Sequence, residues 1–174
     1  MSKIAVILSN GFEEIEGLTP IDVLRRAGLD VDGVSIHDKV VKGSRKILVV
    51  ADYLLSEVDA SNYDCYVLPG GMPGATHLSQ CKELIGVLKN AIEKNKLICA
   101  ICASPAVVLG QNGLYADGVK ATCYPAEDFI KVLGERYEQK SVVVSKNFIT
   151  ADGIKSAMEF AITIAEKLGA TPKF

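Results

Sequence analysis

Continuous apolar runs, each followed directly by a turn, constrain the fold of this chain more than any other feature. Residues 4–8, 64–68 and 97–101 form such runs, the second with one aspartate at its start. A strand that is apolar on both faces has to be covered on both faces, which is typical of a parallel sheet. Residues 81–94 show the apolar spacing of a helix that could supply such cover. The chain is therefore predicted to form a mostly parallel sheet with helices on both faces.

Periodicity and turn residues predict the remaining elements. Helices are expected over residues 12–27, ended by Gly28, and over residues 154–168. Ser104 and Pro105 are interpreted as the N-cap and first position of another helix. Strands are expected over residues 31–36, 46–50, 120–123, 141–144 and 148–151. The first two of these strands flank a polar turn at Gly43 and are predicted to form a hairpin.

Composition excludes several classes of function. The 174 residues predict one domain, residues 1–174, and a net charge of −2 offers little to nucleic acid or an anionic membrane. The longest apolar stretch is too short for a membrane span and the N-terminus has no cleavage signal, so a cytoplasmic protein is expected. Five cysteines and two histidines argue against a disulfide framework and a zinc site. No metal or cofactor is expected.

Cys102 is the best candidate for a reactive group. The strand at 97–101 leads directly into Cys102 and Pro105, which predicts a sharp, strained turn that exposes the sulfur. The N–H groups of the following helix favour the thiolate form. A buried structural cysteine is the alternative interpretation of this position. A redox pair with Cys99 is less favoured, because Cys99 lies inside an apolar run and is expected to be buried.

Two further segments end strands at the same predicted edge of the sheet. The backbone of Gly70 and Gly71 follows the strand at 64–68 and can present N–H groups to an anion. Glu13, Glu14 and Glu16 lie where a helix begins, and acids there also complement the helix dipole. Residues 13 and 16 share one helix face, so one carboxyl group beside a thiol can exchange a proton with it.

Together these segments resemble a known family. The motifs are Gly-x-Glu-Glu-x-Glu at 11–16, Leu-Pro-Gly-Gly at 68–71 and Ala-Ile-Cys-Ala-x-Pro at 100–105. They are similar to the motifs of the ThiJ/PfpI superfamily, in its DJ-one branch. Supporting matches lie at residues 20–28, 44–45 and 159–160, so that the resemblance covers nearly the whole chain.

The resemblance implies a fold, an assembly and a set of site residues. The fold is a flavodoxin-like three-layer α/β/α sandwich, and the assembly is a homodimer. Cys102 is implied as the nucleophile, with Glu16 in its protonated form as the hydrogen-bond partner. The backbone amides of Gly71 and Ala103 are implied to bind an anion. The residues implied to support the pocket or the dimer face are Gly70, Arg26 and Arg45.

The resemblance also implies an activity with alternatives. The activity is glyoxalase or deglycase chemistry on methylglyoxal or its adducts, so the expected partner is a small aldehyde or adduct. The alternative is a redox-sensing or stress-protective, chaperone-like protein whose Cys102 oxidises to sulfinate. A PfpI-type cysteine peptidase is less favoured, because Ala103 stands where that branch has histidine.

Tyr124 departs from the pattern of many relatives, which place a histidine before the proline at this point. A tyrosine hydroxyl donates a hydrogen bond but is a poor base near neutral pH. A mechanism with a histidine base at this position is therefore not expected, and Tyr124 is predicted to support the pocket. His37 and His77 do not match the position and are expected to be surface or structural residues.

Overall fold

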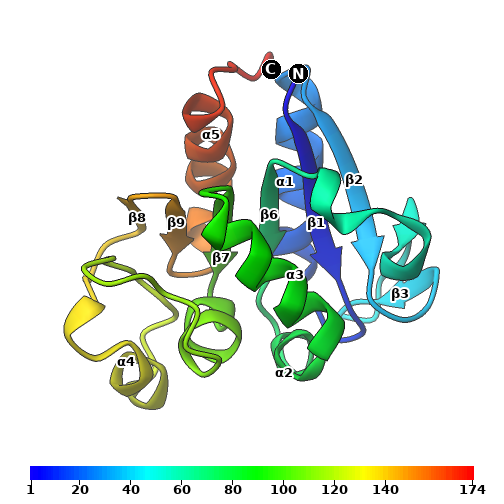
Figure 1. Cartoon of the computed structure of the whole chain (residues 1–174). Helices are drawn as coiled ribbons and strands as arrows, with labels where there is room; N and C mark the ends of the chain where they lie inside the picture. The colour runs from blue at the N-terminus through cyan, green and yellow to red at the C-terminus, as the bar shows by residue number, and fades with distance from the viewer.

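Seven strands form the central sheet of the computed structural model, which describes residues 1–174. Their order across the sheet is β5-β2-β1-β6-β7-β9-β8 (Figure 1). Neighbouring strands are parallel throughout, except that β8 and β9 are antiparallel. The strands are β1 (Lys3–Leu8), β2 (Asp30–Ser35), β5 (Tyr53–Leu54), β6 (Cys65–Leu68), β7 (Leu97–Ile101), β8 (Val142–Ser145) and β9 (Phe148–Ala151). The predicted parallel sheet is confirmed.

Helices cover both faces of this sheet (Figure 1). They are α1 (Glu14–Arg26), α2 (Gly74–Gln80), α3 (Lys82–Glu93), α4 (Glu127–Leu133) and α5 (Ala157–Lys167). On one face, Leu24 of α1 and Phe160 of α5 belong to the same buried cluster as strand residues such as Val6. On the other face, Leu84 and Leu88 of α3 pack in a second cluster. These layers form the expected flavodoxin-like sandwich, and no helix has the length and apolar character to cross a bilayer.

Helix α1 sets the position of the acidic segment. Its N-cap is Glu13, whose carboxylate accepts the N–H of Glu16 at 2.9 Å and so satisfies one free donor of the first turn. Pro20 lies inside the helix without ending it. Gly28, with φ of +78°, follows the C-cap, where a left-handed residue commonly stops a helix.

The hairpin prediction is wrong in its partners. Residues 31–36 do not pair with residues 46–50; β2 instead lies parallel to β1 within the central sheet. The hairpin consists of β3 (Val40–Lys42) and β4 (Leu48–Val50), which form a separate two-stranded sheet around the turn at Gly43. Strand β2 contains two buried valines, Val31 and Val34, so both of its faces have to be covered by other parts of the protein. Only a place within the central sheet provides this cover.

Other local predictions also fail. Residues 120–123 do not form a strand, because the Thr122 N–H donates to the Thr150 side chain and only one isolated bridge forms, from Ala121 to Tyr137. Ser104 and Pro105 do hold the expected N-cap and first positions of a helix, but this helix is a short π-helix (Pro105–Gly110) and the Ser104 side chain does not cap it. The sequence prediction also missed β5, α2 and α4.

Candidate active site

Three strand ends meet at one edge of the sheet. Strands β1, β6 and β7 are parallel neighbours, so the segments that follow Leu8, Leu68 and Ile101 lie together. Crevices beyond the carboxyl ends of strands are the usual ligand sites of open parallel sheets. The predicted convergence of the acidic, glycine-rich and cysteine segments is therefore present in the structure.

Cys102 occupies a sharp turn between β7 and the π-helix. Its φ is +64°, a left-handed value that is unfavourable for a residue with a side chain. Two backbone hydrogen bonds hold it: its N–H donates to the Ala151 carbonyl oxygen at 2.9 Å, and its carbonyl accepts the Tyr124 N–H at 2.8 Å. The side chain stays partly exposed. The strained elbow expected from the sequence is observed.

Glu16 is the acidic residue that faces Cys102. Its side chain is completely buried, and neither carboxyl oxygen has a fully formed hydrogen bond. Gly70 packs between the two residues: a Cβ atom on Gly70 would lie 2.6 Å from Glu16 Oε1 and 2.7 Å from Cys102 Cβ. Any side chain at position 70 would therefore push the carboxyl group, the loop and the cysteine apart.

Burial controls the ionisation of Glu16. It raises the pKa of the carboxyl group to about 7, and the nearby Glu13 carboxylate raises it further, while the Cys102 thiol and the Gly70 N–H oppose the shift. Both opposing groups face the carboxyl group without reaching full hydrogen-bond geometry, which is common in sites without substrate. Glu16 therefore gains and loses its proton near neutral pH.

The Cys102 thiol titrates together with Glu16. Burial and the negative charge of Glu16 raise its pKa, while the backbone N–H groups of Ala103 and Gly71 lower it. The thiolate activation expected from a helix N-terminus is therefore not the net effect: burial and Glu16 outweigh the two N–H groups, and the pKa of the thiol is raised. Because the two groups interact, they titrate as a coupled pair, and a proton on Glu16 favours the thiolate.

The other predicted site residues lie at different distances from Cys102. Tyr124 is next to it through its backbone, and its side chain is 51% exposed. Arg45 lies in the β3–β4 turn, where its N–H donates to Glu14 Oε1 at 2.7 Å. Arg26 pairs with Asp22 at the far end of α1, about 15 Å along the helix from Glu16. Within one chain, the structure does not bring Arg26 to the site.

Two polar residues that the sequence analysis did not assign to the site border it. The Ser104 hydroxyl is fully buried and donates to the Pro69 carbonyl oxygen at 2.5 Å. Glu14 is 4% exposed and accepts from the Ser44 hydroxyl and from two backbone N–H groups of the hairpin turn. The sequence does contain a signal for Ser104, which is a polar residue within an apolar segment. The partners of Glu14 are thirty residues away and give no local signal.

The buried cysteines lie apart from this site. Cys99 is fully buried, as expected, and its sulfur contacts that of Cys65 at 3.8 Å. Burial and this neighbour raise the pKa of Cys99 well above its ordinary value. Cys99 therefore does not form a dithiol with Cys102. The histidine, cysteine and acidic side chains form no cluster of three or more that could hold a metal ion.

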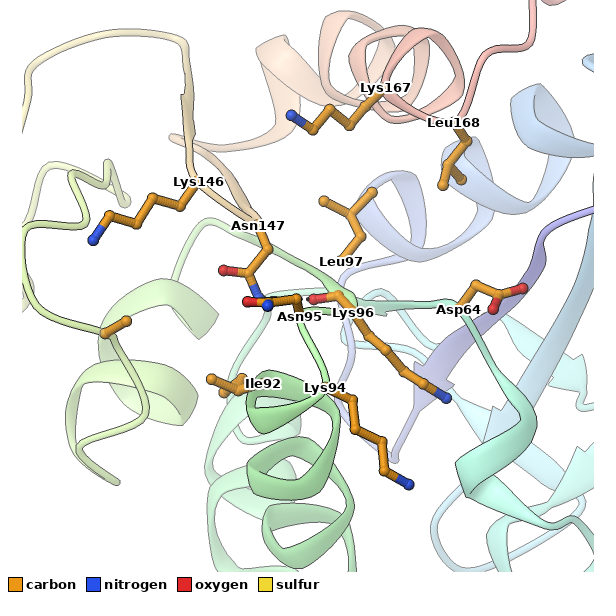
Figure 2. Close-up of a pocket in the computed structure, with 11 residues that line it drawn as sticks. Asp64, Ile92, Lys94, Asn95, Lys96, Leu97, Lys146, Asn147, Lys167 and Leu168 are labelled. Carbon is orange, nitrogen blue, oxygen red and sulfur yellow. Dashed lines mark hydrogen bonds between the residues drawn. The ribbon is translucent and has the colours of Figure 1, made fainter.

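The largest cleft of the molecule is at the opposite edge of the sheet. It has a volume of about 920 Å³ and is lined by four lysines: Lys94, Lys96, Lys146 and Lys167. Figure 2 shows that these side chains leave the cleft in different directions, with Lys146 on one side and Lys94 and Lys96 on the other. Lys96 and Lys146 already donate to backbone carbonyls. The ammonium groups do not converge, so this cleft offers no assembled site.

A partly exposed thiol on an elbow, paired with a buried carboxyl group in a flavodoxin-like fold, defines the class of protein. The sequence model of the DJ-1/PfpI family matches residues 2–167. The chain belongs to this family.

Relatives and solved structures agree with this assignment. Protein DJ-1 homolog B of Arabidopsis thaliana is 40% identical over 166 residues, which are 95% of this chain and 37% of that protein. The chain spans about two fifths of the two Arabidopsis relatives. The glutathione-independent glyoxalase DJR-1.2 of Caenorhabditis elegans is 37% identical, over 90% of this chain and 82% of that protein. The structure of oxidized DJ-1 from Toxoplasma gondii has a TM-score of 0.92 and 42% identity, covering 97% of this chain and 91% of that one.

Proposed function

We propose that this protein is a cysteine-dependent enzyme of the glyoxalase or deglycase type that acts on methylglyoxal or its adducts. The observation that carries the proposal is the pairing of Cys102 with Glu16, whose pKa is raised to about 7. A carboxyl group that titrates near the working pH can serve as acid in one step and as base in the next. The relative from Caenorhabditis elegans that is named a glyoxalase supports the choice of substrate.

The geometry supports an addition as the first step. The Cys102 sulfur adds to the aldehyde carbon, and the thiol proton passes through Glu16 to the carbonyl oxygen, giving a hemithioacetal. The N–H groups of Gly71 and Ala103, which point toward the sulfur, also lie close to where that oxygen becomes negative.

A proton shift then completes the reaction without an external oxidant. The Glu16 carboxylate takes the C–H proton of the adduct and returns it to the neighbouring carbon, while the hydroxyl proton of the adduct passes to the oxygen of that neighbouring carbon. These two proton transfers, through an enediol, turn the hemithioacetal into a thioester. Water hydrolyses the thioester, releases lactate and restores the thiol. Methylglyoxal and water thus account for every atom of the product.

Redox sensing is a second candidate function. Cys102 is partly exposed and lies beside a carboxyl group that can hydrogen-bond a sulfinate oxygen when protonated. The solved structure of the Toxoplasma relative is that of an oxidized protein. In this alternative, peroxide converts the thiolate to the sulfinate, and the oxidised protein changes its binding partners while turnover is negligible.

Lactate formation from methylglyoxal separates the two candidates. The purified protein is expected to form lactate, Cys102→Ser to form none above the buffer rate, and Glu16→Gln to be slower by about 100-fold or more. Cys81→Ser changes another partly exposed thiol and is expected to retain full activity. Absence of turnover in the wild-type protein, with stoichiometric oxidation of Cys102 by peroxide, would favour the sensor.

A further inference from the structure

Ser104 forms a hydrogen bond that crosses the candidate active site from one wall to the other. It belongs to the elbow segment, whereas Pro69 belongs to the glycine loop after β6. The hydroxyl is fully buried and donates to the Pro69 carbonyl oxygen at 2.5 Å, although the two partners are 35 positions apart in the sequence. Serine before a helix usually caps its first turn, but this hydroxyl does not. Its one hydrogen bond is to the loop.

The accepting carbonyl is part of the peptide group that also carries the Gly70 N–H. A peptide group is planar and rigid, so fixing its carbonyl oxygen also fixes the direction of its N–H. That N–H faces the Glu16 carboxyl group. The next carbonyl, of Gly70 itself, accepts the Glu13 N–H at 2.9 Å and fixes the other side of the loop. The Ser104 hydroxyl and the Glu16 carboxyl group thus face opposite ends of one rigid unit, the Pro69–Gly70 peptide group.

The two glycines of the loop, Gly70 and Gly71, have no side chains with which to hold this orientation. Gly70 is required to be a glycine by the closeness of Glu16 and Cys102, and glycine gives the backbone more freedom than any other residue. A tie from outside the loop is therefore needed to keep the peptide group aimed at the carboxyl group. Ser104 is two residues from Cys102, so the same segment that presents the sulfur also supplies this tie.

We propose that Ser104 is a positioning residue that holds the Pro69–Gly70 peptide group with its N–H toward Glu16 and thereby sets how Glu16 and Cys102 share their proton. The inference rests on the proposed roles of these two residues, but it requires no turnover. Two other ionisable groups face the Glu16 carboxyl group: Glu13, from the start of the same helix, and the Cys102 thiol. Neither is changed when the Ser104 hydroxyl is removed.

The test is a direct titration of Glu16. Carbon-13 NMR of protein labelled at the glutamate carboxyl carbon follows the Glu16 signal across pH, and the spectrum of Glu16→Gln identifies that signal. In Ser104→Ala the N–H donates less well to the carboxylate, so the midpoint is expected to rise by about half a unit to one unit. Ser104→Gly removes the same hydroxyl without leaving a methyl group and has to give the same rise.

Ser9→Ala is the matched control. Its hydroxyl is also buried and donates at 2.9 Å to the backbone carbonyl of Gly74, the first residue of α2 just after the loop, but not to the peptide group that faces Glu16. Its midpoint is expected to equal that of the wild type. An unchanged midpoint in either Ser104 variant, or an equal rise in Ser9→Ala, overturns the proposal. A protein that shows the expected shifts but forms no lactate would contradict the proposed enzyme activity and leave the role of Ser104 intact.

Discussion

The surroundings of Glu14 and Glu16 differ although both carboxyl groups are buried in the first turn of α1. Glu14 accepts the Arg45 N–H at 2.7 Å, the Ser44 hydroxyl at 3.3 Å and the Ile47 N–H at 3.4 Å. Burial acts to raise its pKa, but the backbone N–H of Glu14 itself and these three hydrogen bonds together outweigh burial, and the net shift is downward. Glu16 has no fully formed hydrogen bond, and its pKa is raised to about 7.

This difference teaches that hydrogen-bond donors, rather than burial alone, decide what a buried carboxyl group does. Glu14 stays charged and anchors the β3–β4 hairpin to the helix. Glu16 has only the Cys102 thiol and the Gly70 N–H facing it, neither in full hydrogen-bond geometry, and we propose that it exchanges a proton with Cys102. About half a turn of helix therefore separates the structural anchor from the proposed reactive group.

The side of α1 that carries Glu14 also differs from the side that carries Glu16 in its exposed apolar surface. The outer face of the hairpin exposes Val40, Leu48 and Val50, with Ile15 and Ile47 also exposed at the start of the helix and in the turn. Apolar side chains gathered in one region are typical of an interface with another protein. We propose that the Glu14 side carries the surface of a symmetric dimer, whereas the Glu16 side carries the chemistry.

A charge within that surface is expected to have the largest effect. Leu48 is 65% exposed, so Leu48→Glu is expected to leave the fold intact. At micromolar protein concentration the wild type is expected to be a dimer and this variant a monomer. Sedimentation equilibrium measures the change. Val144→Glu places the same charge on exposed β8, at the other end of the sheet, and is expected to remain dimeric. A monomeric wild type contradicts the interface and any role of Arg45 in a neighbouring subunit's pocket.

The raised pKa of Glu16 predicts how stability depends on pH. The folded protein binds this proton more tightly than the unfolded chain, whose carboxyl group titrates near 4.5. The free energy of unfolding therefore falls as pH rises from about 4.5 to 7. One pKa unit corresponds to about 1.4 kcal/mol, so the fall is about 3 kcal/mol.

Urea unfolding at pH 5 and pH 8 tests this contribution. Glu16→Gln has no proton to lose, so its stability relative to the wild type is expected to improve by about 2.5 kcal/mol between the two pH values. The exposed Glu159 gives the control, since Glu159→Gln is expected to follow the wild type at both. A Glu16→Gln variant that keeps the full pH dependence would contradict the assignment.

The contribution of Glu14 to stability is expected to depend on pH in the opposite direction from that of Glu16, and to be smaller. Glu14→Ala removes the acceptor for the hairpin turn and is expected to cost about 2 kcal/mol at pH 7, measured by urea unfolding. Because the folded-state pKa of Glu14 is lowered, its contribution is present above the ordinary carboxyl pKa and is lost as pH falls through the folded value. Glu14→Gln keeps an accepting oxygen and should lose less than Glu14→Ala. Equal losses would mean that packing, rather than hydrogen bonding, holds the turn.

Local patterns were sufficient to predict the parts of the fold that position the site. The predictions of β1, β6 and β7 from their apolar runs, and of α3 and α5 from their spacing, were correct. Burial on both faces and helical periodicity depend only on residues that are close together in the sequence. The elbow at Cys102 followed from the absence of a loop before Pro105, and the structure has the expected left-handed φ there.

Features that depend on distant partners were not predicted. The partner of the hairpin strand β4 was misassigned, because β3 is only three residues long and exposes two of them, so no extended apolar or alternating run marks it in the sequence. Ser104 fits the local rule for an N-cap, but the Pro69 carbonyl competes for its hydroxyl and wins. The different fates of Glu14 and Glu16 depend on the Ser44–Ile47 turn and on Gly70, which lie 30 and more residues away.

The smallest effect is expected for a substitution of Tyr124. This substitution tests whether the proposed proton transfer depends on Glu16 without help from the Tyr124 hydroxyl. Its hydroxyl has no hydrogen-bond partner within the chain, and the side chain is 51% exposed. Its connection to Cys102 is made by its backbone N–H, which phenylalanine also has. Tyr124→Phe is therefore expected to change kcat/KM for methylglyoxal by less than about threefold, because loss of a positioned acid or base costs about 100-fold or more. Steady-state kinetics across pH 6–9 measure the effect, with Glu16→Gln as the reference for a large loss. A loss of about 100-fold in Tyr124→Phe would show that the hydroxyl takes part in proton transfer and that Glu16 does not act alone.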